Sequence, residues 1–582
     1  MVKNALKKLI DVAAGRVQAD IVIRGGKIAD VYSGLFIDAD LAICDGLIAA
    51  IGEPGSYSGH EIIDANGQYV VPGFIDSHIH IESSFLSPPE LCRLLVPHGA
   101  CAIIADPHEI VNVCGLAGLD YMLKTSENLP LDIKFMIPSC VPSTPFEHSG
   151  ATIDAAAMNE PLRNERVLGL GEMMDYEGVV NAEDRVIDKI LSALRHGKFI
   201  DGHSPGLEGR TLSAYAAGMI HTDHECSTVE EMQRRLERGM YIMLRQGSAC
   251  HDLENLIAGI TNENSRRCLL CSDDLQPKTI FDKGHIDNDL RLCVKHGIDP
   301  MTALRMATLN AAECFGLKDR GGFAPGLRAD IVLLDNIQDF RVNSVFIKGK
   351  RVAENGRYLP ALPVTTGADL SLRGSFHVKD FSEKKLAMSL KNENVWVIDI
   401  KPSTVVTGKS KVKVKIDSSR NFDFDPVLEI VKIAVVERHH NTGNVGLGLI
   451  RGYGIRRGAV AISVAHDSHN IIAAGCSDSD IAAAVKRVIT MDGGAALVAD
   501  GNVIDEMPLP LGGIMSDQNG EWVDSKLKSL QKKAVEELGV NKDIEPLMTL
   551  CFMSLPVIPE LKITDMGLFD AAVFNFIPLE AT

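Results

Sequence analysis

The pattern of hydrophobic and polar positions divides the chain into three stretches of different rhythm. In residues 19–71, short apolar segments such as residues 20–23 are separated by glycines and other turn residues. Glycine-bounded segments of this length are typical of β-strands joined by tight turns. A similar rhythm returns at residues 324–334 and 345–350. We therefore expect two short β-rich flanks, one on each side of a longer middle stretch.

The middle stretch, residues 72–320, alternates apolar runs with helical patterns. This alternation predicts βα units and a parallel (β/α)8 TIM-type barrel, and the length is sufficient for eight units. Catalytic residues of such barrels lie where the strands end, so polar residues at those ends are the candidates for chemistry. We expect residues 301–310 to form the closing helix. The predicted strands with their polar ends are residues 70–80, 102–109, 134–140, 167–172, 200–203, 221–224, 241–245 and 268–274.

Beyond residue 367 the pattern changes again. Residues 395–400 and 459–464 predict strands, and residues 480–489 predict a helix. This mixture indicates a separate α+β domain at the C-terminal end. We expect these domain boundaries: a β-rich unit from residues 1–71 with 321–366, the barrel at 72–320 and the C-terminal domain at 367–582.

Composition and charge narrow the class of protein. The formal net charge of −18 at pH 7 argues against a nucleic-acid backbone or an anionic membrane as the main partner. No signal peptide or membrane-spanning apolar run is evident, so we expect a cytoplasmic protein. The 13 cysteines are scattered, and the Cys268-x-x-Cys271 pair lies in an apolar run. We expect these two cysteines to be buried core residues, because free cysteine commonly behaves as a small hydrophobe.

The apolar run at residues 70–80 ends in His78-Ile79-His80. Residues i and i+2 of a strand point to the same face, so these two imidazoles lie side by side. Two neutral imidazoles that converge on one point form the start of a site for zinc, iron or manganese. A His-x-His pair alone is equally compatible with the polar face of a half-buried strand, so further ligands are required.

The preceding residues, Pro72-Gly73-Phe74-Ile75-Asp76, make the motif more specific. Together with His78 and His80, this string resembles the first barrel strand of the metal-dependent amidohydrolase superfamily. The resemblance implies that the two β-rich flanks join into one small composite β-sandwich beside the barrel. The second flank carries the corresponding Gly-x-x-Ala-Asp-Ile-Val signature at residues 326–332.

The resemblance also implies a ligand set at the strand ends. It would hold two divalent ions, with Glu172 as the bridging carboxylate in place of the carboxylated lysine that many amidohydrolases carry. An oxygen-rich set favours Mn(II) or Fe(II), with Zn(II) possible. Such ions lower the pKa of a bound water, and Asp273 is placed to shuttle its proton. The implied metal ligands are His78, His80, Glu172, His203, His224 and Asp273, of which Glu172 and Asp273 are the implied catalytic residues.

Five longer strings lie at residues 201–207, 222–226, 272–274, 305–310 and 465–471. They closely resemble the prokaryotic adenine deaminases, and this resemblance covers essentially the whole chain. It implies purine salvage by hydrolysis of adenine to hypoxanthine and ammonia, through a hydroxide that bridges two metal ions. Asp274 resembles the second of the paired aspartates of other purine deaminases, which contacts the ring near N7. Arg245 and Ser248 are candidates to bind the purine edge, although a surface ion pair is an equal interpretation of Arg245. We expect a homo-oligomer, as a dimer.

Other interpretations remain open at this point. The chain is compatible with another binuclear amidohydrolase, such as an amino-sugar deacetylase or a cyclic amide hydrolase, and with a non-catalytic scaffold barrel. Glu82, Asp106 and His108 lie near the predicted barrel mouth without an assigned role. The histidines of the C-terminal domain allow three hypotheses, namely a further metal site, a lid over the barrel mouth, or an interdomain seam. These histidines are His439, His440, His466 and His469.

Overall fold

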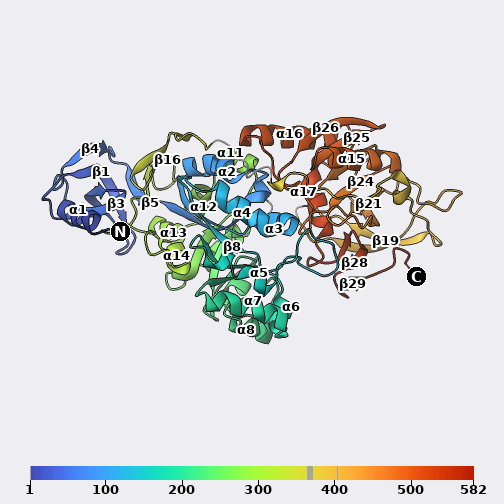
Figure 1. Cartoon of the computed structure of the whole chain (residues 1–582), viewed down its shortest axis with the longest axis horizontal. Coiled ribbons are helices and arrows are strands. Elements are labelled where there is room, and N and C mark those ends of the chain that lie inside the picture. The colour runs from blue at the N-terminus through green and yellow to red at the C-terminus, as the bar shows by residue number, and fades with distance from the viewer. Residues whose placement is uncertain (1, 249, 364–370, 403, 582) are drawn as a thin grey trace.

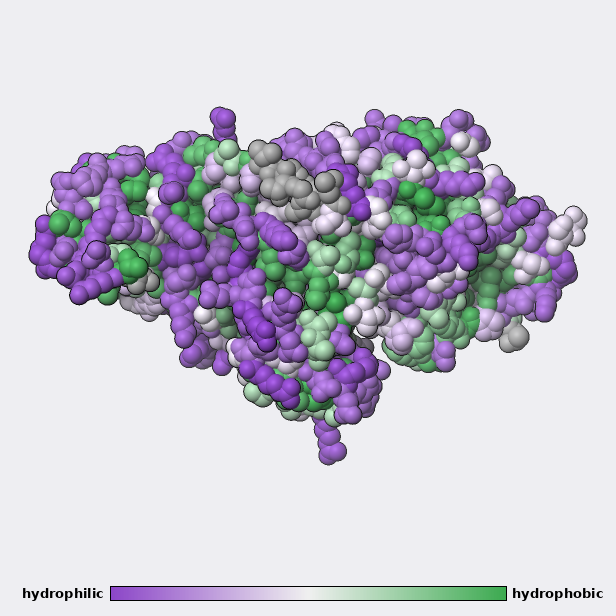
Figure 2. All heavy atoms as spheres, in the orientation of Figure 1, coloured by the Kyte–Doolittle hydropathy of each residue, from purple (hydrophilic) through white to green (hydrophobic). Residues whose placement is uncertain are grey.

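The computed structural model describes residues 2–248, 250–363, 371–402 and 404–581. Figure 1 shows three parts in a row, with the N-terminal strands β1, β3 and β4 at one side, a barrel in the middle, and the C-terminal sheet at the other side. Hydrophilic side chains cover most of the face seen in Figure 2. Among the described residues, no helix combines the length and apolar composition that crossing a bilayer requires.

The two β-rich flanks form one nine-stranded sheet. The junction is the antiparallel pairing of β5 with β15, in which Pro72 faces Ile331. Strand β1 is twelve residues long and bulges between Ile23 and Gly26, so its first half pairs with β4 and its second half with β5. This change of partner folds the sheet over a core built from both flanks. Its strands are β1 (Ala19–Asp30), β2 (Leu35–Cys44), β3 (Leu47–Gly52), β4 (Gly59–Asp64), β5 (Tyr69–Pro72), β15 (Ile331–Leu334), β16 (Val342–Ile347), β17 (Lys350–Glu354) and β18 (Arg357–Tyr358).

The middle stretch forms the predicted parallel barrel. Strands β6 to β10 pair in chain order, β11 to β13 do the same, and His221 N donates to Ile200 O at 3.2 Å between β10 and β11. Asp273 and Asp274 pair with the end of β6, which closes the barrel. The strands are β6 (Phe74–His80), β7 (Ala100–Ala105), β8 (Asp132–Ile137), β9 (Val167–Met173), β10 (Phe199–Gly202), β11 (Thr222–Asp223), β12 (Tyr241–Arg245), β13 (Cys268–Cys271) and β14 (Asp273–Asp274).

Helices surround the barrel. The predicted closing helix is present but breaks at Thr308, so it forms the two segments α13 and α14. Cys268 and Cys271 are both fully buried, which confirms that they are core residues. The helices are α1 (Lys3–Ala13), before the first sheet, and then α2 (Pro88–Leu95), α3 (His108–Cys114), α4 (Leu116–Thr125), α5 (Ala155–Met158), α6 (Tyr176–Val180), α7 (Asp184–Arg195), α8 (Gly209–Ala217), α9 (Val229–Leu236), α10 (Leu253–Leu256), α11 (Pro277–Lys283), α12 (Ile286–Lys295), α13 (Pro300–Ala307) and α14 (Leu309–Cys314).

The C-terminal part is built on an eight-stranded sheet, which confirms the expected mixture of strands and helices. Ile481, Val485 and Val488 of α15 pack on alanines of its central strands. The loop between β23 and β24 is directed at the barrel and is described below. The elements are β19 (Asn394–Asp399), β20 (Gly408–Lys413), β21 (Ile430–Val436), β22 (Val445–Arg451), β23 (Ala459–Ile462), β24 (Ile471–Gly475), α15 (Asp478–Thr490), β25 (Gly494–Ala499), β26 (Asn502–Pro508), α16 (Gly520–Glu536), α17 (Pro546–Cys551), β27 (Leu561–Thr564), β28 (Gly567–Asp570) and β29 (Asn575–Phe576).

Candidate metal centre

The two histidines of β6 are buried and present the same ring nitrogen to one point. His78 Nδ1 lies 3.1 Å from Asp201 Oδ2, and His80 Nδ1 donates to the backbone oxygen of Asp106 at 2.8 Å. Each Nδ1 therefore carries the proton, and each Nε2 keeps its lone pair. The two Nε2 atoms are 3.1 Å apart. Two lone pairs at this distance repel each other unless a cation or proton lies between them, so the pair fits a metal ion.

Glu172, at the C-terminal end of β9, directs its two oxygens to different imidazoles. Oε2 lies 2.9 Å from His203 Nδ1 and 3.1 Å from His224 Nε2. Oε1 lies 3.0 Å from His108 Nδ1 and 3.6 Å from His80 Nε2. One carboxylate thus faces two sets of nitrogen ligands, which is the arrangement that a bridge between two ions requires.

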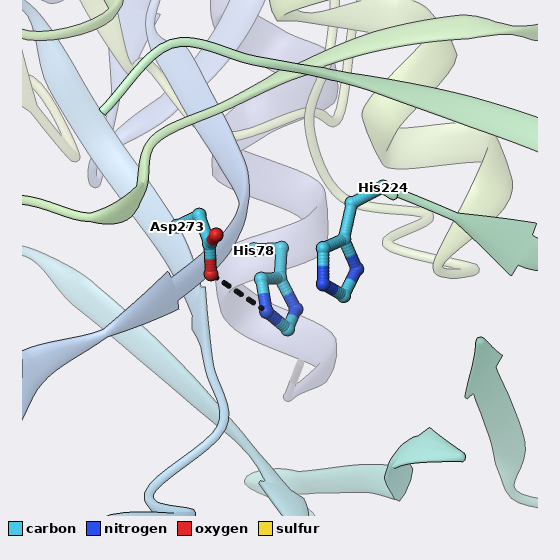
Figure 3. A group of neighbouring side chains, drawn as sticks. All are labelled: His78, His224 and Asp273. Carbon is cyan, nitrogen blue, oxygen red and sulfur yellow. Dashed lines mark ion pairs between the residues drawn. The ribbon is translucent and has the colours of Figure 1, made fainter. Parts of the chain in front are cut away.

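Asp273 lies between the β6 histidines and the guanidinium group of Arg245. Its Oδ1 is 3.0 Å from His80 Nε2 and 3.6 Å from His78 Nε2, and its Oδ2 is 3.0 Å from Arg245 Nη1. The backbone of Asp273 has φ +58°, a left-handed conformation that aspartate tolerates better than most residues and that is common at functional sites. Figure 3 shows its carboxylate beside His78, with the His224 ring on the far side of His78. The two rings stack with centroids 4.1 Å apart.

All six predicted ligands therefore meet at one end of the barrel, although they come from strands that are distant in sequence. Three overlapping groups of three residues can be drawn from them, and within each group the ligand-type atoms lie within 4.8 Å of one another. The shared members are His78, Glu172 and His224. The groups are His78 with His224 and Asp273, His78 with His80 and Glu172, and Glu172 with His203 and His224.

The electrostatics of this cluster favour bound positive charge. Burial raises the pKa of Glu172, but hydrogen bonds from His108, His203 and His224 outweigh burial and hold it well below its ordinary value. Burial lowers the pKa of His224, but Glu172 and Asp273 outweigh burial and raise it to about 10. The buried carboxylates thus stay ionised and hold protons on the imidazoles. A divalent cation supplies the same positive charge without those protons.

Several supporting residues were not recognised in the sequence. Asp76 accepts a hydrogen bond from Ser272 N at 3.1 Å and lies 2.7 Å from His285 Nε2, so it ties β6 to the residue between β13 and β14. Glu225 Oε1 lies 3.5 Å from His224 Nε2, next to the cluster. The signal for Asp76 was its place inside the Pro-Gly-Phe-Ile-Asp string, and Glu225 directly follows His224.

Asp106 and Glu82, which had no predicted role, fix the backbone around the cluster. Asp106 Oδ2 accepts from Glu172 N at 2.9 Å, and a Cβ added at Gly171 would lie 2.0 Å from the same oxygen. Glycine at position 171 therefore allows Asp106 to approach the end of β9. Glu82 Oε1 accepts from Ile110 N at 3.0 Å, which joins the segment after β6 to α3.

The three predicted purine-binding residues lie at the same end of the barrel but differ in their contacts. Arg245 contacts three carboxylates, those of Glu225, Asp252 and Asp273. Ser248 N donates to the backbone oxygen of Asp274 at 2.7 Å, whereas the Ser248 hydroxyl lies 2.7 Å from Thr279 Oγ1. The Asp274 carboxylate accepts a hydrogen bond from Ser83. The contacts of Arg245 are therefore those of a residue that holds the Asp273 carboxylate in position.

Comparison with known proteins agrees with this geometry. Residues 69–352 match the amidohydrolase family, and residues 404–575 match the adenine deaminase C-terminal domain. The chain is 58% identical over 582 residues to adenine deaminase 2 of Desulfotalea psychrophila, which covers 100% of both chains. It is 48% identical to an adenine deaminase of Ligilactobacillus salivarius, again over 100% of both, and 49% identical to one of Nitratidesulfovibrio vulgaris strain DP4, over 98% of both. Both resemblances stated for the sequence are confirmed, and the chain belongs to the adenine deaminase family of amidohydrolases.

Proposed function

We propose that this chain hydrolyses adenine to hypoxanthine and ammonia. The observation that carries this function is a complete set of six ligand-type side chains at the mouth of a barrel, in a chain related over its full length to adenine deaminases. A scaffold barrel would be expected to lack some of these ligands. An amino-sugar deacetylase or cyclic amide hydrolase is less well supported, because the chain also matches the adenine deaminase C-terminal domain.

We infer that the cluster holds two divalent ions, with Mn(II) or Fe(II) favoured and Zn(II) possible. His78, His80 and Asp273 would hold one ion, His203 and His224 the other, and Glu172 would be shared. Carboxylate oxygens make the donor set harder than imidazoles alone, which favours manganese or iron over zinc. When bound, the ions supply Lewis-acid activation of a water and of the purine C6.

Asp273 is the proposed proton shuttle. It takes a proton from the nucleophilic water at Oδ1 and returns protons to the purine N1 and to the departing amine, so it ends the cycle ionised. Arg245 supports this role because its contact with Oδ2, at 3.0 Å, leaves Oδ1 as the oxygen that faces the histidines. Water gives its oxygen to C6 and its two protons to the products, which balances the conversion of adenine to hypoxanthine and ammonia.

Asp274 is the proposed contact for the purine ring near N7. It directly follows Asp273, the proposed proton shuttle, and is partly exposed. One of its oxygens accepts a hydrogen bond from the Ser83 hydroxyl. We propose that Arg245 and Ser248 shape this side of the purine site, Arg245 through Asp273 and Ser248 through its bond to the Asp274 backbone.

The test is a purine screen that follows ammonia release from the enzyme purified with Mn(II) or Fe(II). Adenine should give the highest kcat/KM, and a chelator should abolish turnover that added metal restores. Fully metal-loaded protein that releases no ammonia from adenine, yet cleaves an N-acetyl amino sugar or a cyclic amide, would instead identify one of the alternative hydrolases.

We also propose that the enzyme works in the cytoplasm as a homo-oligomer, in the form of a dimer, without a nucleic-acid or membrane partner. The net charge of −18 supports the last point, because phosphate backbones and anionic lipids repel such a surface. Light scattering of the purified enzyme measures the assembly, and a mass of one chain would contradict the dimer.

A further inference from the structure

The loop between β23 and β24, residues 463–470, carries polar side chains from the C-terminal domain to the barrel. His466 Nδ1 lies 3.6 Å from Glu109 Oε1 of α3, and the His466 ring stacks on Phe552 with centroids 4.5 Å apart. Asp467 is 3% exposed and Ser468 is 2% exposed. This loop therefore lies between the two parts of the molecule, against the helix that follows the second barrel strand.

Around this loop, other residues form an ordinary hydrogen-bonded seam. His440 Nε2 lies 2.7 Å from the backbone oxygen of Ser149, and Asn470 Nδ2 donates to the backbone oxygen of His148 at 2.8 Å. His148 Nδ1 lies 2.6 Å from Asp565 Oδ2. The interdomain-seam hypothesis is thus the one that fits His440.

A third metal site is less well supported. His108, Glu109 and His466 have ligand-type atoms within 4.8 Å of one another. However, His108 Nδ1 already faces Glu172 at 3.0 Å, and Glu109 Oε1 accepts from Ser83 Oγ at 3.0 Å. The ion pair with Glu172 directs His108 to the main cluster, and of the Glu109 carboxylate only Oε2 lacks a hydrogen-bond partner among the described residues.

Asp467 of this loop is buried, and one of its carboxylate oxygens has no hydrogen-bond partner among the described residues. Its Oδ2 has no hydrogen bond among the described residues, although a buried carboxylate oxygen without one is costly. The carboxylate is hydrogen-bonded to Ser143, which lines a cavity of about 930 Å³ at the edge of the barrel. Burial raises the pKa of Asp467, and the charges that act on it come from His108, Glu172 and His203. Asp467 thus contacts a residue that lines the cavity and is close enough to the metal centre for the charges of that centre to act on it.

We propose that residues 465–468 form the wall of the adenine site opposite the metal centre, and that Asp467 Oδ2 accepts the N9–H of the free base. This inference rests on the proposed function. Adenine carries one N–H on its imidazole ring, at N7 or N9, and a nucleoside has a sugar in place of the proton at N9. A buried, unpaired carboxylate oxygen accepts that N–H and rejects the substituted base, since loss of the hydrogen bond would leave the carboxylate unsatisfied. Asp467 is therefore a specificity-determining residue supplied by the C-terminal domain.

The test compares Asp467→Ala and Asp467→Asn with Asp565→Asn, which removes a buried charge from the seam of the same interface. Asp565 is 2% exposed and pairs with His148, away from the metal ligands. Kinetics with adenine, metal content and thermal unfolding are measured for each protein. Asp467→Ala should raise KM by about 10- to 100-fold with a smaller change in kcat, the loss expected for a hydrogen bond to a charged group. Asp467→Asn, which keeps an acceptor oxygen, should raise KM less, and Asp565→Asn should leave KM within about twofold.

A second measurement isolates the N–H contact. Inhibition by 9-methyladenine, in which a methyl group replaces the N9 proton, is compared with the KM for adenine, and Asp467→Ala should reduce the preference for adenine over this analogue. An unchanged KM and an unchanged preference in folded Asp467→Ala, with adenine turned over by the wild type, would overturn the proposed wall alone. Absence of adenine turnover in the metal-loaded wild type would overturn the proposed function as well.

Discussion

Asp201 Oδ2 lies 3.1 Å from His78 Nδ1, so a carboxylate at the end of β10 fixes the tautomer of a histidine on β6. Both side chains are fully buried. The contact leaves His78 Nε2 as the nitrogen that faces His80 and Asp273. A carboxylate behind a histidine also makes the imidazole a stronger base and a better metal ligand. The ability of the cluster to hold metal thus depends on a residue that does not itself face the ions.

Replacing Asp201 by Asn should therefore weaken metal binding by about 10- to 100-fold, because the amide neither orients nor polarises the imidazole as a carboxylate does. Competition with a chelator, followed by metal analysis, measures this change. Asp287→Asn is the control, since the buried Asp287 places Oδ2 3.3 Å from Nδ1 of the partly exposed His98, in a carboxylate–imidazole pair outside the cluster. Equal metal affinity in the Asp201 variant and the wild type would contradict the supporting role.

Asp273→Asn should lower kcat for adenine by about 100- to 10,000-fold, the usual contribution of a positioned proton donor and acceptor. An amide at this position retains the shape of the side chain but cannot carry the proton. The measurement is kcat at saturating adenine together with metal content and the unfolding temperature. Near-normal kcat with two ions bound would show that another group moves the proton.

Glu172→Ala should lower the occupancy of both ions as well as the rate, because one carboxylate faces both sets of imidazoles. Glu172→Gln provides an isosteric comparison that removes the charge while keeping the size of the side chain. Metal stoichiometry after dialysis distinguishes a shared ligand from a ligand to one ion. Loss of a single ion in the alanine variant would indicate that Glu172 serves only one of them.

Lys562 should make the stability of the protein depend on pH. It is fully buried, donates to the backbone oxygens of Val405 and Phe552 at 2.9 and 3.0 Å, and has its pKa lowered by burial to about 7 from 10.5. Between these two values the unfolded chain binds the proton and the folded chain does not, so this group adds stability as pH rises from 7 to 10.5.

Lys562→Met removes that dependence. The difference in unfolding free energy, variant minus wild type, should be largest near pH 7. It should fall by on the order of 2–4 kcal/mol towards pH 10, because only the wild type gains stability over this range. Denaturant unfolding across this range gives the difference, and Lys415→Met, at an exposed position, is the control. Parallel pH profiles for the Lys562 variant and the wild type would show that the buried amine keeps its ordinary pKa.

The sequence by itself determined which side chains are available and where most of them lie along the strands. His78 and His80 share a face because the side-chain period of a strand is two, and this follows without any knowledge of the partner strands. Glu172, His203, His224 and Asp273 could be predicted as neighbours because a parallel barrel brings its strand ends to one mouth. The β-rich flanks and the C-terminal α+β part were also recognisable from patterns of apolar and turn residues, whereas the joining of the two flanks followed from the resemblance to the amidohydrolases.

Only the tertiary structure decided which atoms face each other. It turns the two oxygens of Glu172 to different imidazoles, places Asp201 behind His78, and surrounds Arg245 with carboxylates. It also brings Asp467 to the barrel from a separate sheet. Side-chain direction and contacts across hundreds of residues depend on barrel closure and on interdomain packing. Local periodicity carries no information about either, because it specifies the face of an element and not the neighbour of that face.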